Sequence, residues 1–312
     1  MAAAPNRIGP AAEQLAAALP ALLVAAERVA ATVVQGVHGR RRVGSGETFW
    51  QYRRYQGGDS ASAIDWRQSA KSQKTFVREN EWEAAQSVWL WRDRSASMDY
   101  QSGAEVERKQ DRADLLLLAL ASLLLRGGEH VGLYGQDNTA TGGRATLNRL
   151  GAHLQARRGI TPAQSGLPEA GRLPRFAQLV LFGDFLAPMD EVEAMVERFA
   201  DQGARGQLVQ ILDPAEEDLP FLGRTEFEGP EDEGRLLIGR VESLRDGYLQ
   251  RMAARRQSLR DITRRAGWGF AAHRTDRPPQ TVLLALYNAL SNNLAGNLRV
   301  NVGGGLGGRS GP

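Results

Sequence analysis

Three oxygen-bearing side chains stand at alternate positions directly after an apolar run of the chain. The run Ser87–Trp91 is short and apolar, as in a buried β-strand, and it is followed by Asp93, Ser95 and Ser97. In an extended loop, residues two positions apart can turn toward one side, so one carboxylate and two hydroxyls could face a single point. Mg²⁺ (or Mn²⁺) prefers oxygen ligands of this kind and keeps several waters. The spacing therefore predicts a divalent cation site.

A second carboxylate follows a later apolar run. The predicted strand Gln178–Phe182 is followed by Gly183 and Asp184. If this strand neighbours the first one, Asp184 would face the same cleft and could hold the ion through a water molecule. Two alternatives stay open from the sequence alone. Asp184 could be a turn or capping residue before the next helix, and Ser95 and Ser97 could cap the helix that follows them.

The elements that must position these residues alternate between apolar strands and helices. This alternation indicates βαβ units, and hence a mostly parallel sheet covered by helices on both faces. Such sheets bind ligands at the carboxyl ends of their strands, which is where Asp93 and Asp184 stand. The strands are predicted over Ser87–Trp91, Val131–Tyr134, Gln178–Phe182, Gln207–Leu212 and Trp268–Ala272. The helices are predicted over Arg108–Arg126, Ala145–Arg157, Met189–Gln202, Val241–Arg265 and Thr281–Leu294.

The predicted fold class is therefore α/β, a three-layer Rossmann-like domain with a mostly parallel central sheet over residues 85–294. We expect the strand Ser87–Trp91 to be central in this sheet, with Gln178–Phe182 beside it. An insertion at 213–240 is expected to form a hairpin. The N-terminal segment 1–38 contains an Ala-rich helix, residues 39–84 are irregular and expected to pack on the main domain, and the Gly-rich tail 295–312 is expected to be disordered.

Composition excludes several classes of protein. The 312 residues are 42% hydrophobic and 24% charged with a net charge of +3, which is typical of a soluble globular protein. The sequence contains no Cys, so disulfides, thiolate metal sites and Cys nucleophiles are excluded. The longest apolar stretch, Leu15–Ala26, is interrupted by Pro20 and is shorter than the roughly 20 residues of a spanning helix. We expect no membrane span and a cytoplasmic protein.

Common catalytic motifs are also absent from the sequence. There is no P-loop, no G-x-S-x-G and no H-E-x-x-H, and the first predicted strand is not followed by G-x-G-x-x-G. The carboxylates form no convincing acid–base pair. The sequence therefore predicts a protein that is not an enzyme.

A series of short motifs, most of them upstream of the first predicted strand, resembles a bacterial family. In order along the chain they are Gly44–Phe49, Arg54–Asp59, Ile64–Trp66, Ser69–Ala70, Val77–Glu79 and Asp93–Met98. Together they resemble the family called domain of unknown function 58, and the resemblance covers about residues 39–290. Turn and core chemistry explains most of these upstream residues, and Phe49, Tyr55 and Trp66 are expected to be core anchors.

The resemblance implies a von Willebrand factor A-like domain with a metal-ion-dependent adhesion site. Asp93, Ser95 and Ser97 would then be direct metal ligands, Asp184 a water-mediated ligand, and Thr161 the residue that fits the remaining ligand position. Many relatives have a hydroxyl residue where this chain has Gly183. The resemblance further implies a MoxR-type AAA ATPase and an unidentified client protein as partners, with this protein as adaptor or co-chaperone.

Two other classes of function compete with an interaction module. Nucleic-acid binding is suggested by Arg40–Arg42 and by Arg53 and Arg54, but no aromatic stacking module or helix-turn-helix accompanies these arginines, which makes a nucleic-acid partner the weaker expectation. A metal-dependent phosphoesterase could use Asp93 and Asp184 as ligands, although a two-metal centre would need more carboxylates.

Overall fold

The computed structural model describes residues 21–34, 49–54, 64, 66–71, 75–80, 87–156, 166–174, 176–230 and 234–303. The chain divides into two compact units, one of residues 39–85 and one of residues 1–38 together with 86–312. The smaller unit contains the antiparallel pair β1 (Phe49–Arg54) and β2 (Phe76–Asn80) and the short helix α2 (Trp66–Ser69). The expectation that Trp66 is a core anchor is wrong, because its side chain is 68% exposed. Trp66 is the first residue of the short helix α2, and its ring lies largely in solvent.

The larger unit is built on a five-stranded parallel sheet in the order β4-β3-β5-β6-β9. These strands are β3 (Ser87–Arg92), β4 (His130–Leu133), β5 (Gln178–Gly183), β6 (Arg205–Leu212) and β9 (Gly269–Arg274). The first strand lies inside the sheet and pairs directly with β5, in a register that sets Arg92 opposite Phe182. The prediction that these two strands are neighbours is confirmed, and the carboxyl ends of both strands meet at one edge of the sheet.

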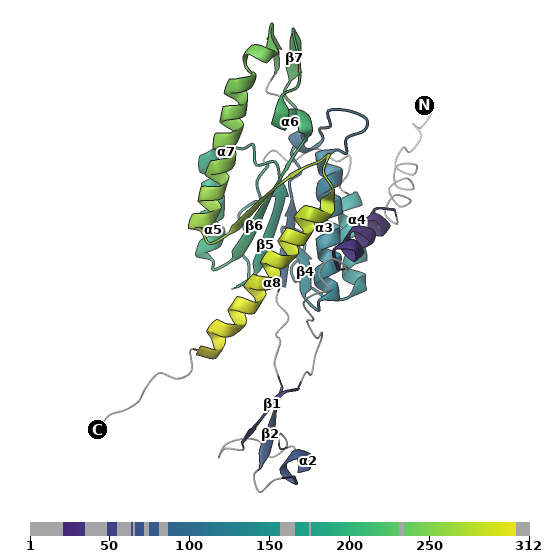
Figure 1. Cartoon of the computed structure of the whole chain (residues 1–312), viewed down its shortest axis with the longest axis vertical. Helices are drawn as coiled ribbons and strands as arrows, with labels where there is room; N and C mark the ends of the chain where they lie inside the picture. Colours follow the sequence, from purple (N-terminus) through teal and green to yellow (C-terminus); the bar gives the residue numbers. More distant parts are fainter. Residues whose placement is uncertain are drawn as a thin grey trace, which may run out of the picture. The chain divides into compact units, whose positions relative to one another are not determined.

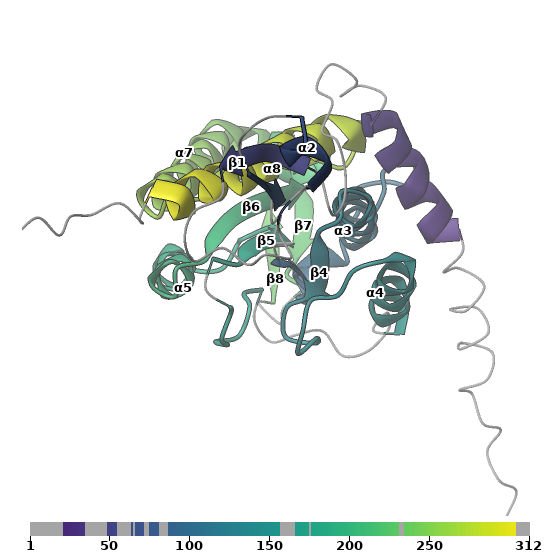
Figure 2. The same cartoon turned by 90° about the horizontal axis from the view of Figure 1, so that it is seen from below.

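Helices cover both faces of this sheet and make a three-layer, Rossmann-like domain (Figure 1). One face packs against α3, α4, α8 and the helical segment 21–34, and Figure 2 shows that segment beside α3 and α4. The other face packs against α5 and α7. The bounds are α3 (Lys109–Arg126), α4 (Arg144–Ala156), α5 (Met189–Asp201), α6 (Pro214–Asp218), α7 (Arg245–Arg265) and α8 (Pro279–Gly303).

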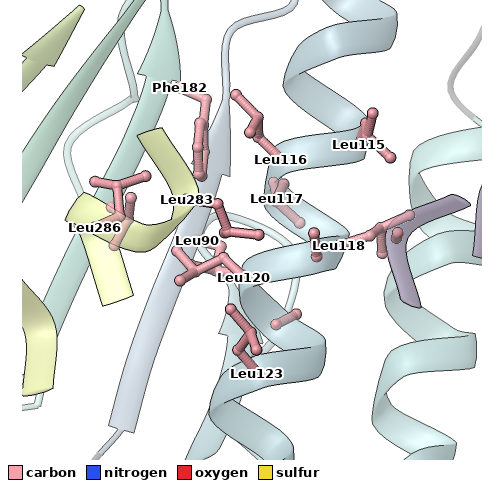
Figure 3. Packing of buried hydrophobic residues seen from close by; sticks show 14 of the residues in the cluster. Leu90, Leu115, Leu116, Leu117, Leu118, Leu120, Leu123, Phe182, Leu283 and Leu286 are labelled. Atoms are coloured by element: carbon pink, nitrogen blue, oxygen red, sulfur yellow. The ribbon is translucent and has the colours of Figure 1, made fainter. Parts of the chain in front are cut away.

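The helix α3 lies in the middle of its layer and is apolar almost all round. A helix with this pattern must be buried on several sides. Figure 3 shows its leucines Leu116, Leu117 and Leu120 beside Phe182 of β5 and Leu283 of α8. Because α3 is packed from several directions, its first residue, Lys109, is held at a fixed position at the carboxyl edge of the sheet.

Two elements differ from the sequence expectation. The helix α8 continues to Gly303, so the expectation of a disordered tail from residue 295 is wrong for residues 295–303. The Asn and Gly residues in this stretch each cost a helix less than about 1 kcal/mol, which is too little to end it. The long helix predicted from Val241 begins instead at Arg245, after a 3-10 turn over Val241–Ser243. The expected hairpin is present as β7 (Thr225–Glu228) and β8 (Arg235–Ile238).

Gly206 of β6 lies directly against the ring of Trp268, so an added Cβ would overlap that ring. We expect Gly206→Ala to lower the free energy of unfolding by about 2 kcal/mol, because the buried ring has to shift in a packed layer. Gly247→Ala is the matched control, since a Cβ at this α7 position meets open space and Ala favours a helix. Urea unfolding of both variants measures the difference, and equal midpoints would contradict the prediction.

Candidate functional site

The site begins where β3 ends. The Asp93 amide donates to the Phe182 carbonyl at 2.8 Å, which continues the β3–β5 pairing by one residue. Arg92, directly before it, forms a buried ion pair with Asp114 of α3, with 2.8 Å between Nε and Oδ1. These two anchors fix the backbone from which the Asp93 side chain projects, and that side chain is fully buried.

The loop after β3 folds its polar side chains onto one another. The Ser95 amide donates to Oδ1 of Asp93 at 2.7 Å, and the Oγ atoms of Ser95 and Ser97 lie 2.9 Å apart. Ser97 Oγ in turn donates to Oδ2 of Asp184 at 2.6 Å. The structure therefore brings together four of the five residues predicted as metal ligands.

The capping alternatives receive little support from the geometry. Ser95 precedes the 3-10 turn Ala96–Met98, but its side chain makes no capping hydrogen bond. The residue that precedes the first turn of α5 is Pro188, so Asp184 is not its N-cap. Asp184 does have a local turn role, because its Oδ1 accepts the Leu186 amide at 3.1 Å, while its Oδ2 reaches the β3 loop.

One oxygen of this cluster has no hydrogen-bond partner among the described residues. It is Oδ2 of Asp93, which is shielded from solvent. Two glycines adjoin it: an added Cβ would lie 3.1 Å from this oxygen at Gly166 and 3.2 Å from it at Gly183. The backbone at Gly183 therefore packs closely against Asp93, and a Cβ at this position would crowd the Asp93 side chain. A buried carboxylate oxygen without a partner is what a bound cation would satisfy, so these residues fit an Mg²⁺ ion.

The protonation of Asp93 reflects the same environment. Burial raises the pKa of Asp93 to about 7, and the neighbouring carboxylate of Asp184 contributes to the rise, against the lowering effect of the Ser95 hydrogen bonds. Without a cation, the protonated form of Asp93 is therefore well populated up to about neutral pH. A bound divalent cation would favour the charged form, so cation binding and proton release are coupled at this site.

The sequence reasoning missed a buried lysine in this cluster. The ammonium of Lys109, at the start of α3, lies 2.9 Å from Oδ2 of Asp184 and 2.6 Å from Oε1 of Glu216. Burial lowers the pKa of Lys109, but the two carboxylates outweigh burial and leave the pKa above its usual value, so the side chain is charged. One signal was available: Lys109 is one of three lysines in a chain whose other cations are arginines.

Two other sequence expectations cannot be placed here. Thr161 and the Arg40–Arg42 cluster lie outside the described residues. The described part of the chain contains no cluster of three His, Cys, Asp or Glu side chains that could hold a metal ion, so a site here depends on serine hydroxyls. In the same part of the chain, no helix has the length and apolar character needed to cross a membrane.

The fold and this edge of the sheet define a three-layer α/β protein with buried polar side chains gathered at the carboxyl ends of neighbouring strands. The chain belongs to the family described as Protein of unknown function DUF58, which matches residues 51–258.

Curated relatives with similar sequences are named as uncharacterized proteins. The chain is 26% identical over 276 residues to Uncharacterized protein Rv1480 of Mycobacterium tuberculosis and to Uncharacterized protein Mb1516 of Mycobacterium bovis, covering 85% of this chain and 86% of each relative. Among solved structures, the conserved hypothetical protein BatB from Bacteroides thetaiotaomicron matches 68% of this chain and all of its own, at 13% identity and a TM-score of 0.40.

Proposed function

We propose that this protein is a non-enzymatic interaction module that binds an acidic group of a partner protein through a divalent cation. Asp93, Ser95, Ser97 and Asp184 would hold the cation, as in the adhesion site of von Willebrand factor A-like domains. The observation that carries the proposal is the unpartnered, buried Oδ2 of Asp93 beside the Ser97–Asp184 hydrogen bond, among the described residues. Mg²⁺ or Mn²⁺ bound there would keep open positions that a carboxylate from outside the chain can fill.

The charges around the cluster favour binding over turnover. The Lys109 ammonium donates hydrogen bonds to Oδ2 of Asp184 and to Oε1 of Glu216. Within the described residues, this leaves Asp93 as the carboxylate of the cluster with an oxygen free to accept. A two-metal hydrolytic centre needs more carboxylates than that. We therefore propose a binding role without catalysis.

The class of partner is inferred from the resemblance of the sequence motifs to those of the family. We propose a MoxR-type AAA ATPase as the partner, with this protein as an adaptor or co-chaperone toward an unidentified client, in the cytoplasm. In that arrangement, the cation would bridge Asp93 to a Glu or Asp side chain of the partner. Asp93, Ser95 and Asp184 are buried and Ser97 is half-buried, so the partner's carboxylate would approach on the Ser97 side of the site.

The test measures the affinity of the purified protein for a MoxR-type ATPase. One measurement contains about 5 mM Mg²⁺, a concentration chosen to fill a weak Mg²⁺ site, and the other contains excess EDTA. We expect EDTA to weaken the complex by about tenfold or more, since removing the cation leaves two like-charged carboxylates facing each other. Asp93→Ala should bind with the same reduced affinity in both buffers, because this variant holds no cation for EDTA to remove. Asp201→Asn, an exposed carboxylate at the end of α5, is the matched control and should change nothing.

Each other outcome contradicts a different part of the proposal. Unchanged affinity in EDTA would contradict the cation bridge but not the partnership, and no complex in either buffer would contradict the partnership. Salt-sensitive retention on DNA would favour the nucleic-acid alternative. Turnover of a generic phosphate ester that is lost in Asp93→Ala would contradict the absence of catalysis.

A further inference from the structure

The Lys109 ammonium contacts Asp184, one of the carboxylates proposed to hold the cation. Its side chain is completely buried and is shared by Asp184 and Glu216. A buried ammonium is costly unless carboxylates compensate it, and here two do. The carboxylate oxygen that Lys109 contacts, Oδ2 of Asp184, is the same atom that accepts the Ser97 hydrogen bond.

Glu216 is held rigidly against this lysine. It belongs to the capping box that starts α6, where its Oε2 accepts the Asp213 amide at 2.9 Å. Asp213 in turn accepts the amides of Ala215 and Ser102, at 2.7 and 2.9 Å. The backbone carbonyl of Glu216 accepts the hydroxyl of Tyr248. Since both carboxylates and the start of α3 are fixed by packing and hydrogen bonds, Lys109 cannot leave the cluster without breaking several contacts.

We propose that Lys109 is a built-in counter-cation that sets the divalent-cation affinity of the site formed by Asp93, Ser95, Ser97 and Asp184, with Glu216 as the second carboxylate that holds the ammonium. This inference rests on the proposed cation site. Three carboxylates and one ammonium leave two negative charges, which one divalent ion balances. Without the ion, Lys109 neutralises Asp184 and lets the edge of the sheet fold. When the ion is bound, the Lys109 ammonium repels the ion across Asp184 and keeps the affinity of the site for the ion low.

Two substitutions with opposite charge effects test the inference. Lys109→Met removes the competing cation and is expected to tighten Mg²⁺ and Mn²⁺ binding by about tenfold or more. Glu216→Gln removes one negative charge and leaves Lys109 wholly to Asp184, so it is expected to weaken binding severalfold. If Lys109 were merely a structural tie, both substitutions would loosen the same cluster and both would weaken binding.

Calorimetric titration of each ion, with thermal melts in EDTA and in Mg²⁺, gives the readout. Lys109→Met should melt lower than wild type in EDTA and recover with Mg²⁺, whereas the wild-type melting temperature should depend little on Mg²⁺. Lys71→Met, an exposed lysine of the smaller unit, is the matched control and should change neither quantity. If Lys109→Met fails to fold, the Lys109→Met, Glu216→Gln double variant replaces it and should bind more tightly than Glu216→Gln alone.

The outcomes separate this inference from the proposed function. Binding by wild type with equal or weaker binding by Lys109→Met would overturn the inference and leave the cation site standing. Binding by Lys109→Met alone would support the inference and overturn the cation bridge in the natural protein. No binding by either protein would overturn both.

Discussion

Replacing Asp93 by Asn is expected to abolish Mg²⁺ binding and, without the ion, to raise the free energy of unfolding at pH 8 by about 4 kcal/mol. Burial and the neighbouring Asp184 carboxylate raise the pKa of Asp93 to about 7. A carboxyl whose pKa is raised on folding stabilises the folded state when protonated, and that contribution is lost as the pH rises from about 4 to about 7. Asn keeps the acceptor for the Ser95 amide and cannot ionise.

Urea unfolding in EDTA at pH 5 and at pH 8 checks the effect on stability. Calorimetric titration of Mg²⁺ and Mn²⁺ at pH 8 checks the loss of cation binding. Wild type should be less stable relative to the Asn variant at the higher pH, and Mg²⁺ should stabilise wild type alone. Asp201→Asn on the surface of α5 should behave as wild type. Equal binding heats from wild type and Asp93→Asn would mean that the motif is only a turn, and the cation site should then be dropped.

Acid sensitivity is expected to depend on His273, which lies on β9 and is buried. Burial lowers the pKa of His273 to about 4, and the Arg112 guanidinium beside it adds to the shift, while Asp276 opposes it. The Nε2 atom of His273 is 3.4 Å from Nη1 of Arg112. A histidine with a lowered pKa stabilises the fold when neutral. We therefore expect about 3 kcal/mol of stability to be lost as the pH falls from about 6.5 to about 4.

His273 and Asp93 act in opposite directions over nearly the same pH range, so wild-type stability should change less with pH than either group alone predicts. The His273 effect is best measured in the Asp93→Asn background. There, stability should fall steeply below about pH 6, and adding His273→Gln should flatten the profile. His130→Gln, an exposed histidine at the start of β4, should leave the slope unchanged. A profile that stays equally steep after the His273→Gln substitution would contradict the assignment.

Much of the fold could be predicted because its signals are local. Apolar runs bounded by turns marked each strand of the sheet, and the runs of leucine in α3 marked a helix that is buried on several sides. The placement of Asp93 and Asp184 after two such strands was enough to predict that they meet. That prediction needed only the rule that carboxyl ends of parallel strands share an edge.

Other features could not be read from local patterns. The exposed position of Trp66 and the continuation of α8 to Gly303 depend on what the surrounding chain leaves uncovered. Trp66 has a side chain that is normally buried, and its sequence neighbourhood does not say whether anything covers it. The burial of His273 is likewise a property of the packing around β9.

The sequence by itself determined the α/β alternation and the placement of Asp93, Ser95, Ser97 and Asp184 directly after strands, because strand periodicity and loop spacing act over a few residues. Only the tertiary structure decided the charge of the site. Ser97 meets Asp184 across 87 positions of the chain, and Lys109 meets Glu216 across 107. Contacts over such distances depend on the order of strands in the sheet and on where α3 and α6 begin, and no local pattern in the sequence encodes that.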